Sequence, residues 1–327
     1  MVGLIGVTRF GATSEGGQVQ RIVLRAGELT VGLLTYGSIL HSVRLDGVAH
    51  DLTLGSDVLA DYEAGMQYHG ALVGPVANRI SDARARIAGQ VHRFEETVGT
   101  TTLHSGATGI HRRVWRLAEV TEDTAILTLE LADGLGGFPG NRRLTARWSV
   151  LAPATLRLDL TATTSAPTLM NIANHSYWNL DGSETWVGHR LRVAADTYLP
   201  LNADCLPTGE IAPVAGTDLD LRAGAEVRPG YPNVDHNFCL AKARGPLRQA
   251  VELTGATGTT MTVLTTEPGV QIYDGRDAER PGRGHHEGLA IEPQGWPDAP
   301  NQPGFPSITL SPGEIYSQTT EWHFRAG

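Results

Sequence analysis

The chain has 327 residues, 41% of them hydrophobic, which is enough for a large buried core and excludes an intrinsically disordered chain. Its formal net charge is −9, and the 26 Lys and Arg residues form no run or stripe, so the electrostatic signature of a nucleic-acid-binding protein is missing. No apolar run approaches the roughly 18–20 residues that span a bilayer, and residues 1–10 lack the basic start of a signal peptide. We therefore expect a cytoplasmic protein with no membrane or nucleic-acid partner.

Cysteine usage agrees with this expectation. Cys205 and Cys239 are the only two cysteines, and they do not form a C-x-x-C pair. Two thiols in a chain of this length make no disulfide framework. We expect both to be reduced and buried.

One short helical pattern stands out early in the chain. In residues 56–64, Ser56 or Asp57 is a candidate N-cap, and Leu59 and Tyr62 fall on one face. Helical patterns are otherwise scarce.

Strand patterns dominate the rest of the chain. Apolar and polar residues alternate in 127–131, 156–161 and 190–193, and residues 261–266 are β-branched and apolar. Turn signals such as Asp-Gly and Pro-Gly separate these segments. The polar, glycine-rich segment 276–285 is expected to be an exposed loop. The pattern predicts an all-β protein with antiparallel strands packed in two layers.

Polar residues gather in five segments beside aromatic and turn residues. The segments are 74–80 (Gly-Pro-Val-Ala-Asn-Arg-Ile), 103–106 (Leu-His-Ser-Gly), 171–180 (Asn-Ile-Ala-Asn-His-Ser-Tyr-Trp-Asn-Leu), 234–238 (Val-Asp-His-Asn-Phe) and 291–301 (Ile-Glu-Pro-Gln-Gly-Trp-Pro-Asp-Ala-Pro-Asn). Any one of them alone is explained by loop hydrogen bonds or an exposed carboxylate. Together they supply the groups that bind a neutral polyol and transfer its protons.

These five segments, in this order and at this spacing, resemble the motifs of aldose 1-epimerases, the galactose mutarotases. Further matches cover the whole chain, at 34–37 (Leu-Thr-Tyr-Gly), 51–55 (Asp-Leu-Thr-Leu-Gly), 136–140 (Gly-Gly-Phe-Pro-Gly), 206–211 (Leu-Pro-Thr-Gly-Glu-Ile) and 310–316 (Leu-Ser-Pro-Gly-Glu-Ile-Tyr). The resemblance implies a single domain over residues 1–327 with the large two-layer antiparallel β-supersandwich of galactose mutarotases. It also implies an isomerase that needs no cofactor and no metal, and that interconverts the α and β anomers of a free aldohexose such as galactose or glucose.

The resemblance also implies the catalytic pair. Glu292 matches the family's general base, and with a usual glutamate pKa of about 4.3 it would be ionised at neutral pH. His175 matches the general acid, and a nearby Glu292 would help to keep its imidazole protonated.

Three further residues match the family's substrate-binding positions: Arg79, His104 and Asp235. An exchange of roles between His104 and His175 stays open. Asn78 is a neighbouring candidate, with a turn cap as the alternative. Trp296 is expected to line the pocket as a platform for the sugar, with a place in the core as the alternative.

Two departures from the family pattern bear on specificity. Pro75 replaces a common arginine, and Gly295-Trp296 stands where His-Phe is usual. An epimerase for a hexose 6-phosphate, a non-catalytic carbohydrate-binding protein and a glycoside hydrolase using Asp235 with Glu292 are rival interpretations. The preferred aldose, the pathway and the choice between monomer and homodimer stay open.

Overall fold

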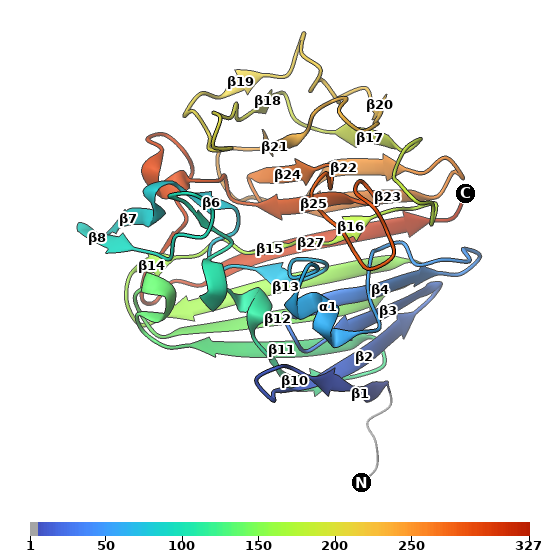
Figure 1. Ribbon diagram of the computed structural model, residues 1–327, viewed down its shortest axis with the longest axis horizontal. Helices are drawn as coiled ribbons and strands as arrows, with labels where there is room; N and C mark the ends of the chain where they lie inside the picture. The colour runs from blue at the N-terminus through green and yellow to red at the C-terminus, as the bar shows by residue number, and fades with distance from the viewer. Residues whose placement is uncertain (1–5) are drawn as a thin grey trace.

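The protein is described here by a computed structural model over residues 6–327, and its regular secondary structure consists almost entirely of antiparallel strands (Figure 1). Its largest sheet has nine strands in the order β10-β11-β12-β13-β27-β23-β22-β17-β20. Their bounds are Arg116–Val120, Thr124–Leu131, Arg142–Leu151, Thr155–Thr164, Tyr316–Arg325, Thr260–Thr265, Arg248–Thr254, Arg190–Val193 and Ala225–Glu226.

Two smaller sheets complete the main framework. A four-stranded sheet near the N-terminus contains β1 (Val7–Ala12), β2 (Gln18–Ala26), β3 (Leu29–Leu34) and β4 (Ile39–Leu45). A six-stranded sheet has the order β16 (Tyr177–Trp178), β25 (Leu289–Gln294), β24 (Gly269–Tyr273), β21 (Asp235–Cys239), β18 (Thr197–Tyr198) and β19 (Ala212–Pro213).

Short strand pairs and single helical turns fill the edges. The pairs are β14 (Thr168–Leu169) with β26 (Thr309–Leu310), β15 (Ala173–Asn174) with β5 (Leu72–Val73), β6 (Arg79–Ile80) with β9 (Thr102–Leu103), and β7 (Arg84–Ile87) with β8 (Gln90–Arg93). The helical turns are α1 (Leu59–Glu63) and the 3₁₀ turns Ser81–Ala83, Gly106–Thr108, Ile110–Arg112, Leu135–Gly137 and Ala299–Asn301.

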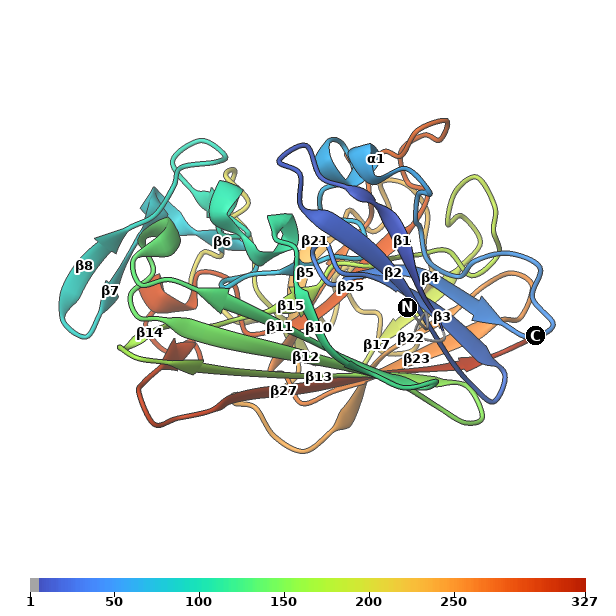
Figure 2. The same cartoon turned by 90° about the horizontal axis from the view of Figure 1, so that it is seen from below.

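The sheets form layers around one large hydrophobic core, with smaller buried clusters beside it. The long strands of the nine-stranded sheet run along one side of the molecule, and the smaller sheets lie above them (Figure 2). Between the layers the indole rings of Trp148 and Trp178 both pack on Trp322, with ring centroids 6.1 and 6.2 Å apart. Trp178 is therefore a core residue.

The strand predictions are confirmed. Segment 127–131 lies in β11, 156–161 in β13 and 190–193 forms β17, while 261–266 largely coincides with β23. Buried and exposed residues alternate along β13 and β17, because successive side chains of a strand point to opposite faces.

The predicted helix at 56–64 is shorter than expected. It begins at Leu59, and Leu59 and Tyr62 are its buried residues, as predicted. The predicted cap is wrong, because no side chain caps the helix. The Ser56 hydroxyl instead accepts a hydrogen bond from the Val58 N–H (3.1 Å) and contacts the Asp61 carboxylate, which fixes the turn before the helix.

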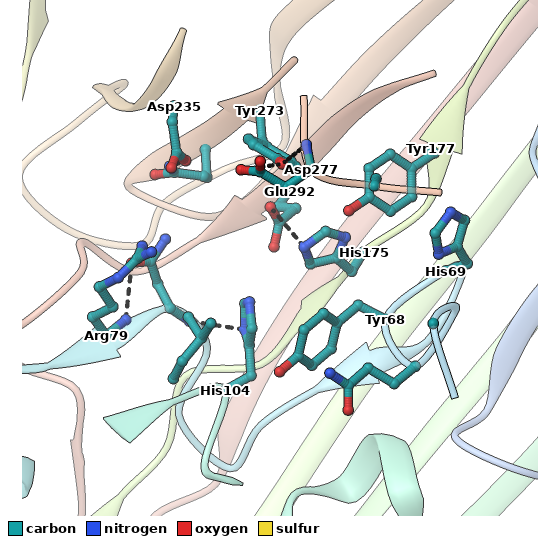
Figure 3. Close-up of a pocket in the computed structure, with 16 residues that line it drawn as sticks. Tyr68, His69, Arg79, His104, His175, Tyr177, Asp235, Tyr273, Asp277 and Glu292 are labelled. Carbon is teal, nitrogen blue, oxygen red and sulfur yellow. Dashed lines mark hydrogen bonds and ion pairs between the residues drawn. The ribbon is translucent and has the colours of Figure 1, made fainter. Parts of the chain in front are cut away.

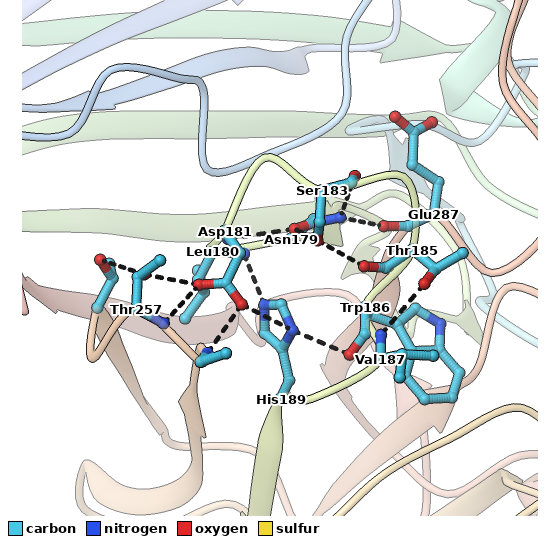
Figure 4. Close-up of polar contacts among 12 residues, drawn as sticks. Asn179, Leu180, Asp181, Ser183, Thr185, Trp186, Val187, His189, Thr257 and Glu287 are labelled. Atoms are coloured by element: carbon cyan, nitrogen blue, oxygen red, sulfur yellow. Dashed lines mark hydrogen bonds and ion pairs between the residues drawn. The ribbon is translucent and has the colours of Figure 1, made fainter.

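A polar network anchors the chain where it leaves the segment 171–180 (Figure 4). The Asp181 carboxylate accepts hydrogen bonds from the N–H groups of Ala256 (2.8 Å) and Thr257 (3.0 Å). The ring of His189 accepts one from the Leu180 N–H at 2.9 Å. A Cβ on Gly255 would lie 2.4 Å from the Asp181 carboxylate, so only glycine permits this approach. The network ties the end of the segment to the turn between β22 and β23.

Within residues 6–327, no helix is long and apolar enough to cross a membrane. Both cysteines are unpaired. Cys239 is buried as predicted, whereas Cys205 is partly exposed, which corrects the expectation of two buried thiols. Segment 276–285 is largely exposed, as predicted.

Several buried histidines make folding sensitive to acid. Burial lowers the pKa of His41 to about 4 and the pKa values of His69 and His111 to about 3, all below the usual histidine value of about 6.5. The unfolded chain therefore binds these protons first as the pH falls. The contribution of each buried, neutral histidine to the free energy of unfolding is complete above pH ~6.5. It is lost as the pH falls from there through the pKa of the folded state.

We therefore expect the His111→Phe variant to be less sensitive to acid. Between pH ~6.5 and 4.5, its free energy of unfolding should fall less steeply than that of the wild type, by up to about 1.4 kcal/mol per pH unit. Urea unfolding at a series of pH values measures the slope. The exposed Val58→Thr variant, which removes no titratable group, is the control and should keep the wild-type slope. An unchanged slope in His111→Phe would contradict the burial argument.

Candidate active site

A polar cavity of about 280 Å³ opens over the six-stranded sheet (Figure 3). Residues from distant parts of the chain line it: Gly65, Gln67, Tyr68, His69, Asn78, Arg79, Leu103, His104, His175, Tyr177, Asp235, Gln271, Tyr273, Asp277, Ala278 and Glu292. The cavity is therefore a product of the tertiary fold.

Strand register places four polar side chains on one face of the six-stranded sheet. Glu292 on β25 lies opposite Gln271 on β24, and Tyr273 on β24 lies opposite Asp235 on β21. Directly opposite residues share a face, and so do residues two apart on one strand. The Gln271 side-chain amide also donates a hydrogen bond to the Asp235 carboxylate at 2.6 Å, which holds that acceptor in place.

The central contact of the cavity joins a carboxylate and an imidazole. His175 Nε2 lies 3.5 Å from Glu292 Oε1, and the two side chains are 6% and 2% exposed. The backbone of His175 is fixed on both sides, since its N–H donates to the Ala71 carbonyl (2.9 Å) and its carbonyl accepts from the Gly70 N–H (3.1 Å). Asn174 donates its side-chain amide to the Gly70 carbonyl at 2.8 Å, so it supports the same turn.

The opposite wall comes from the paired strands β6 and β9. The Asn78 N–H donates to His104 Nδ1 (3.1 Å), and the His104 N–H donates to the Asn78 carbonyl (2.9 Å). Asn78 adopts a left-handed backbone with φ of 61°, which asparagine tolerates better than most residues. Because Nδ1 accepts a hydrogen bond, the neutral His104 ring carries its proton on Nε2.

Burial shifts the pKa values of Glu292 and His175. It raises the pKa of Glu292 well above its usual value, and the nearby Asp235 charge adds to this rise while Arg79 opposes it. Burial also lowers the pKa of His175 to about 4. The expectations that Glu292 keeps an ordinary pKa and that it keeps the His175 imidazole protonated are therefore wrong, because desolvation is the largest cause of both shifts. Both shifts favour the uncharged form of the group, the carboxylic acid of Glu292 and the neutral imidazole of His175.

Several buried polar atoms at the cavity have no hydrogen-bond partner among residues 6–327. They are Glu292 Oε2, Arg79 Nε and His175 Nδ1. Buried polar atoms are almost always satisfied in folded proteins, so unsatisfied ones call for an explanation. A hydroxyl-rich ligand in the cavity would supply partners to the atoms that face it.

The same groups offer potential metal ligands. Ligand atoms of His104, His175 and Glu292 all lie within 4.8 Å of one another, so these three side chains could hold a metal ion. Two imidazoles and a carboxylate serve equally for acid–base chemistry.

Among the residues predicted from the sequence, six line the cavity: Glu292, His175, Arg79, His104, Asp235 and Asn78. Trp296 does not. Its indole N–H donates to the Pro268 carbonyl (3.0 Å), and its ring packs edge-to-face on Phe305 with centroids 5.0 Å apart. Strand β25 ends at Gln294, so the alternation that directs Glu292 into the cavity does not continue to position 296. The core alternative for Trp296 is the correct one.

Tyr68, Tyr177 and Asp277 are among the lining residues that were not singled out from the sequence. Tyr68 stacks on the His175 ring with centroids 5.6 Å apart. Tyr177 follows His175 by two residues. Residues two apart in an extended segment point to the same side, so this spacing could have predicted Tyr177 as a lining residue. Asp277 lies in the exposed segment 276–285, where no pattern distinguishes it.

Fold and cavity together define an all-β enzyme whose buried carboxylate and histidine can exchange protons with a polar ligand. Comparison with known proteins identifies the family. The sequence model described as "Aldose 1-epimerase" matches residues 20–323. The galactose mutarotase of Mus musculus is 35% identical over 98% of this chain and 99% of its own length. The aldose 1-epimerase of Escherichia coli K12 is 31% identical over 96% and 98% of the two chains.

Solved structures agree. An aldose epimerase homologue from C. elegans superimposes with a TM-score of 0.86 at 27% identity, covering 94% of this chain and 98% of that one. The galactose 1-epimerase of Lactobacillus acidophilus gives a TM-score of 0.84 at 26% identity, covering 98% of each chain. This chain belongs to the aldose 1-epimerase family. Its activity is that of an isomerase, and the resemblance and fold class predicted from the sequence are confirmed.

The hydrogen bond from Asn78 predicts the protonation of His104. Burial, with the neighbouring His175 adding to it, holds the pKa of His104 well below 6.5, so the ring should stay neutral with its proton on Nε2 between pH 6 and 8. Nitrogen-15 NMR of the labelled imidazoles distinguishes the two tautomers and the charged form. A proton on Nδ1, or an imidazolium in this range, would contradict the geometry.

Proposed function

We propose that this protein interconverts the α and β anomers of a free aldohexose such as galactose or glucose, with Glu292 as general base and His175 as general acid. The observation that carries the proposal is the 3.5 Å contact between these two buried side chains at a polar cavity. A base and an acid on one wall can serve the two oxygens of one hemiacetal carbon.

The reaction requires two proton transfers. The Glu292 carboxylate removes the proton of the anomeric hydroxyl, His175 protonates the ring oxygen, and the C1–O5 bond breaks to give an aldehyde. Rotation about C1–C2 exposes the other face of the carbonyl. The ring then closes with the two roles reversed.

The pair carries one proton throughout this cycle. Ring opening converts a carboxylate and an imidazolium into a carboxylic acid and an imidazole. Since burial disfavours both charged forms, the neutral pair that accompanies the open-chain aldehyde is the form that the cavity stabilises. Sugar hydroxyls that donate to Glu292 would in turn stabilise its carboxylate form before ring opening.

The remaining polar residues suit a polyol. Asp235 accepts hydrogen bonds from sugar hydroxyls, while Arg79 and the Nε2–H of His104 donate them. Asn78 shapes this wall by holding His104. The Gln271 amide keeps Asp235 oriented.

The charge of the cavity supports an uncharged sugar over a sugar phosphate. Asp235, Asp277 and Glu292 line it, and Arg79 is the only Lys or Arg among the lining residues. A phosphate group generally requires several cationic or backbone donors and is repelled by carboxylates. The hexose 6-phosphate alternative is thus disfavoured.

We also propose that the sugar is the only ligand that the reaction requires, with no cofactor, nucleic acid or membrane, in a monomer or a homodimer. Two unpaired cysteines suit the reducing cytoplasm, which is the location we propose.

Removing either catalytic group should nearly abolish mutarotation. We expect Glu292→Gln and His175→Asn each to lower kcat about 10²- to 10⁴-fold, the usual contribution of general acid–base catalysis. Polarimetry of freshly dissolved α-D-galactose and α-D-glucose measures the rate, and circular dichroism checks folding. The exposed Glu279→Gln variant is the control and should match the wild type.

Two outcomes would contradict this proposal. Wild-type turnover in a folded Glu292→Gln variant would remove Glu292 from the mechanism. Faster turnover of galactose 6-phosphate than of galactose by the wild type would favour the phosphorylated substrate.

A further inference from the structure

The two segments that carry His175 and Glu292 are not paired as strands where these side chains meet. Strand β16 pairs with β25 through Tyr177 and Trp178. Directly before His175 the chain has a different partner, because Ala173 and Asn174 of β15 pair with β5. The β16–β25 ladder thus ends two residues short of the pair, in a register that continues to His175 opposite Glu292, and other contacts hold the two segments together beyond it.

One such contact is a side-chain bridge from Asn171 to the residue after β25. The Gly295 N–H donates to Asn171 Oδ1 at 2.7 Å, and Asn171 Nδ2 donates to the Gly295 carbonyl at 3.2 Å. A Cβ on residue 295 would lie 3.0 Å from both Asn171 Oδ1 and Ile308, which is tighter than usual. Glycine at this position thus favours the close approach of the two segments.

A second connection comes from β27 of the nine-stranded sheet. The Tyr316 hydroxyl accepts a hydrogen bond from the Ile172 N–H (3.0 Å) and donates one to Gln318 Oε1 (2.8 Å). The Gln318 side-chain amide then donates to the Pro293 carbonyl at 3.0 Å. The relay Tyr316–Gln318 therefore joins a backbone group three residues before His175 to one directly after Glu292.

The relay is buried and rigidly held. Tyr316 and Gln318 are buried, and the Arg244 guanidinium lies over the Tyr316 ring at 4.3 Å from its centroid. Pro293 has no N–H of its own to contribute to a sheet ladder, so side-chain capture of its carbonyl helps to fix this point of β25. Without the Tyr316 hydroxyl, the buried Ile172 N–H would lose its partner.

We propose that Tyr316 and Gln318, together with Asn171, are positioning residues that set the separation of His175 and Glu292 for the epimerase reaction. None of the three lines the cavity, so they act through the backbone of the two catalytic segments. The inference rests on the proposed roles of His175 and Glu292.

The test uses Tyr316→Phe, Gln318→Met and the double variant, with initial rates measured over a range of α-D-galactose concentrations. Each single variant should lower kcat about 10- to 100-fold, with KM within about twofold of the wild type, because displacing a catalytic group by about 1 Å can cost 10²-fold in rate. The double variant should be no slower than the slower single variant, since both changes break the same relay.

Thr320→Val on the same strand is the matched control. It removes a buried hydroxyl that lies 3.3 Å from Thr265 Oγ1 and, within residues 6–327, makes no hydrogen bond to the catalytic segments. It should lose stability comparable to the relay variants and keep wild-type kcat. Thermal unfolding shows which variants are folded at the assay temperature.

The Glu292→Gln background separates this inference from the proposed function. There, Tyr316→Phe should cost less than threefold in residual rate, because the pair that it positions is already incomplete. Three results would contradict the relay. They are a normal kcat in folded Tyr316→Phe and Gln318→Met, an equal loss of kcat in Thr320→Val, or a loss of kcat in the double variant equal to the product of the two single losses. An active Glu292→Gln enzyme would instead overturn the proposed catalytic pair itself.

Discussion

Glu292 and His175 meet at 3.5 Å with almost no exposure to water, and the chemistry of the protein depends on that burial. In water a glutamate and a histidine at neutral pH would carry charges set by their usual pKa values. In the cavity, desolvation raises the pKa of the carboxyl group and lowers that of the imidazole. Both shifts favour the uncharged forms of the two groups, which suits a reaction that takes one proton from a sugar and returns one to it.

Keeping this pair buried places demands on the surrounding sheets. The face of the six-stranded sheet that carries Glu292 also carries Gln271 and Asp235, so a polar surface lies in the interior of a β-protein. Such a surface is stable only if its polar groups find partners. The amide of Gln271 supplies a partner to Asp235, and atoms of Glu292 and Arg79 remain for a ligand.

The sequence alone predicted the all-β class, because alternation in segments such as 156–161 reports directly on a half-buried strand. It also predicted six of the lining residues, because their motifs resemble those of a family. Trp296 was misplaced because the strand ends at Gln294, and a strand end is poorly marked in sequence. The pKa values of the pair and the role of Tyr316 depend on contacts between residues more than 100 positions apart, such as Ile172 with Tyr316, which no local pattern reveals.

The orientation of a bound sugar tests the central claim most directly. A crystal structure of the Glu292→Gln variant with galactose would show which side chains face the anomeric centre. We predict the anomeric oxygen within about 3.2 Å of the residue 292 side chain and the ring oxygen at a similar distance from His175 Nε2. A ring oxygen bound by His104, or an anomeric centre directed away from residue 292, would contradict the assigned roles.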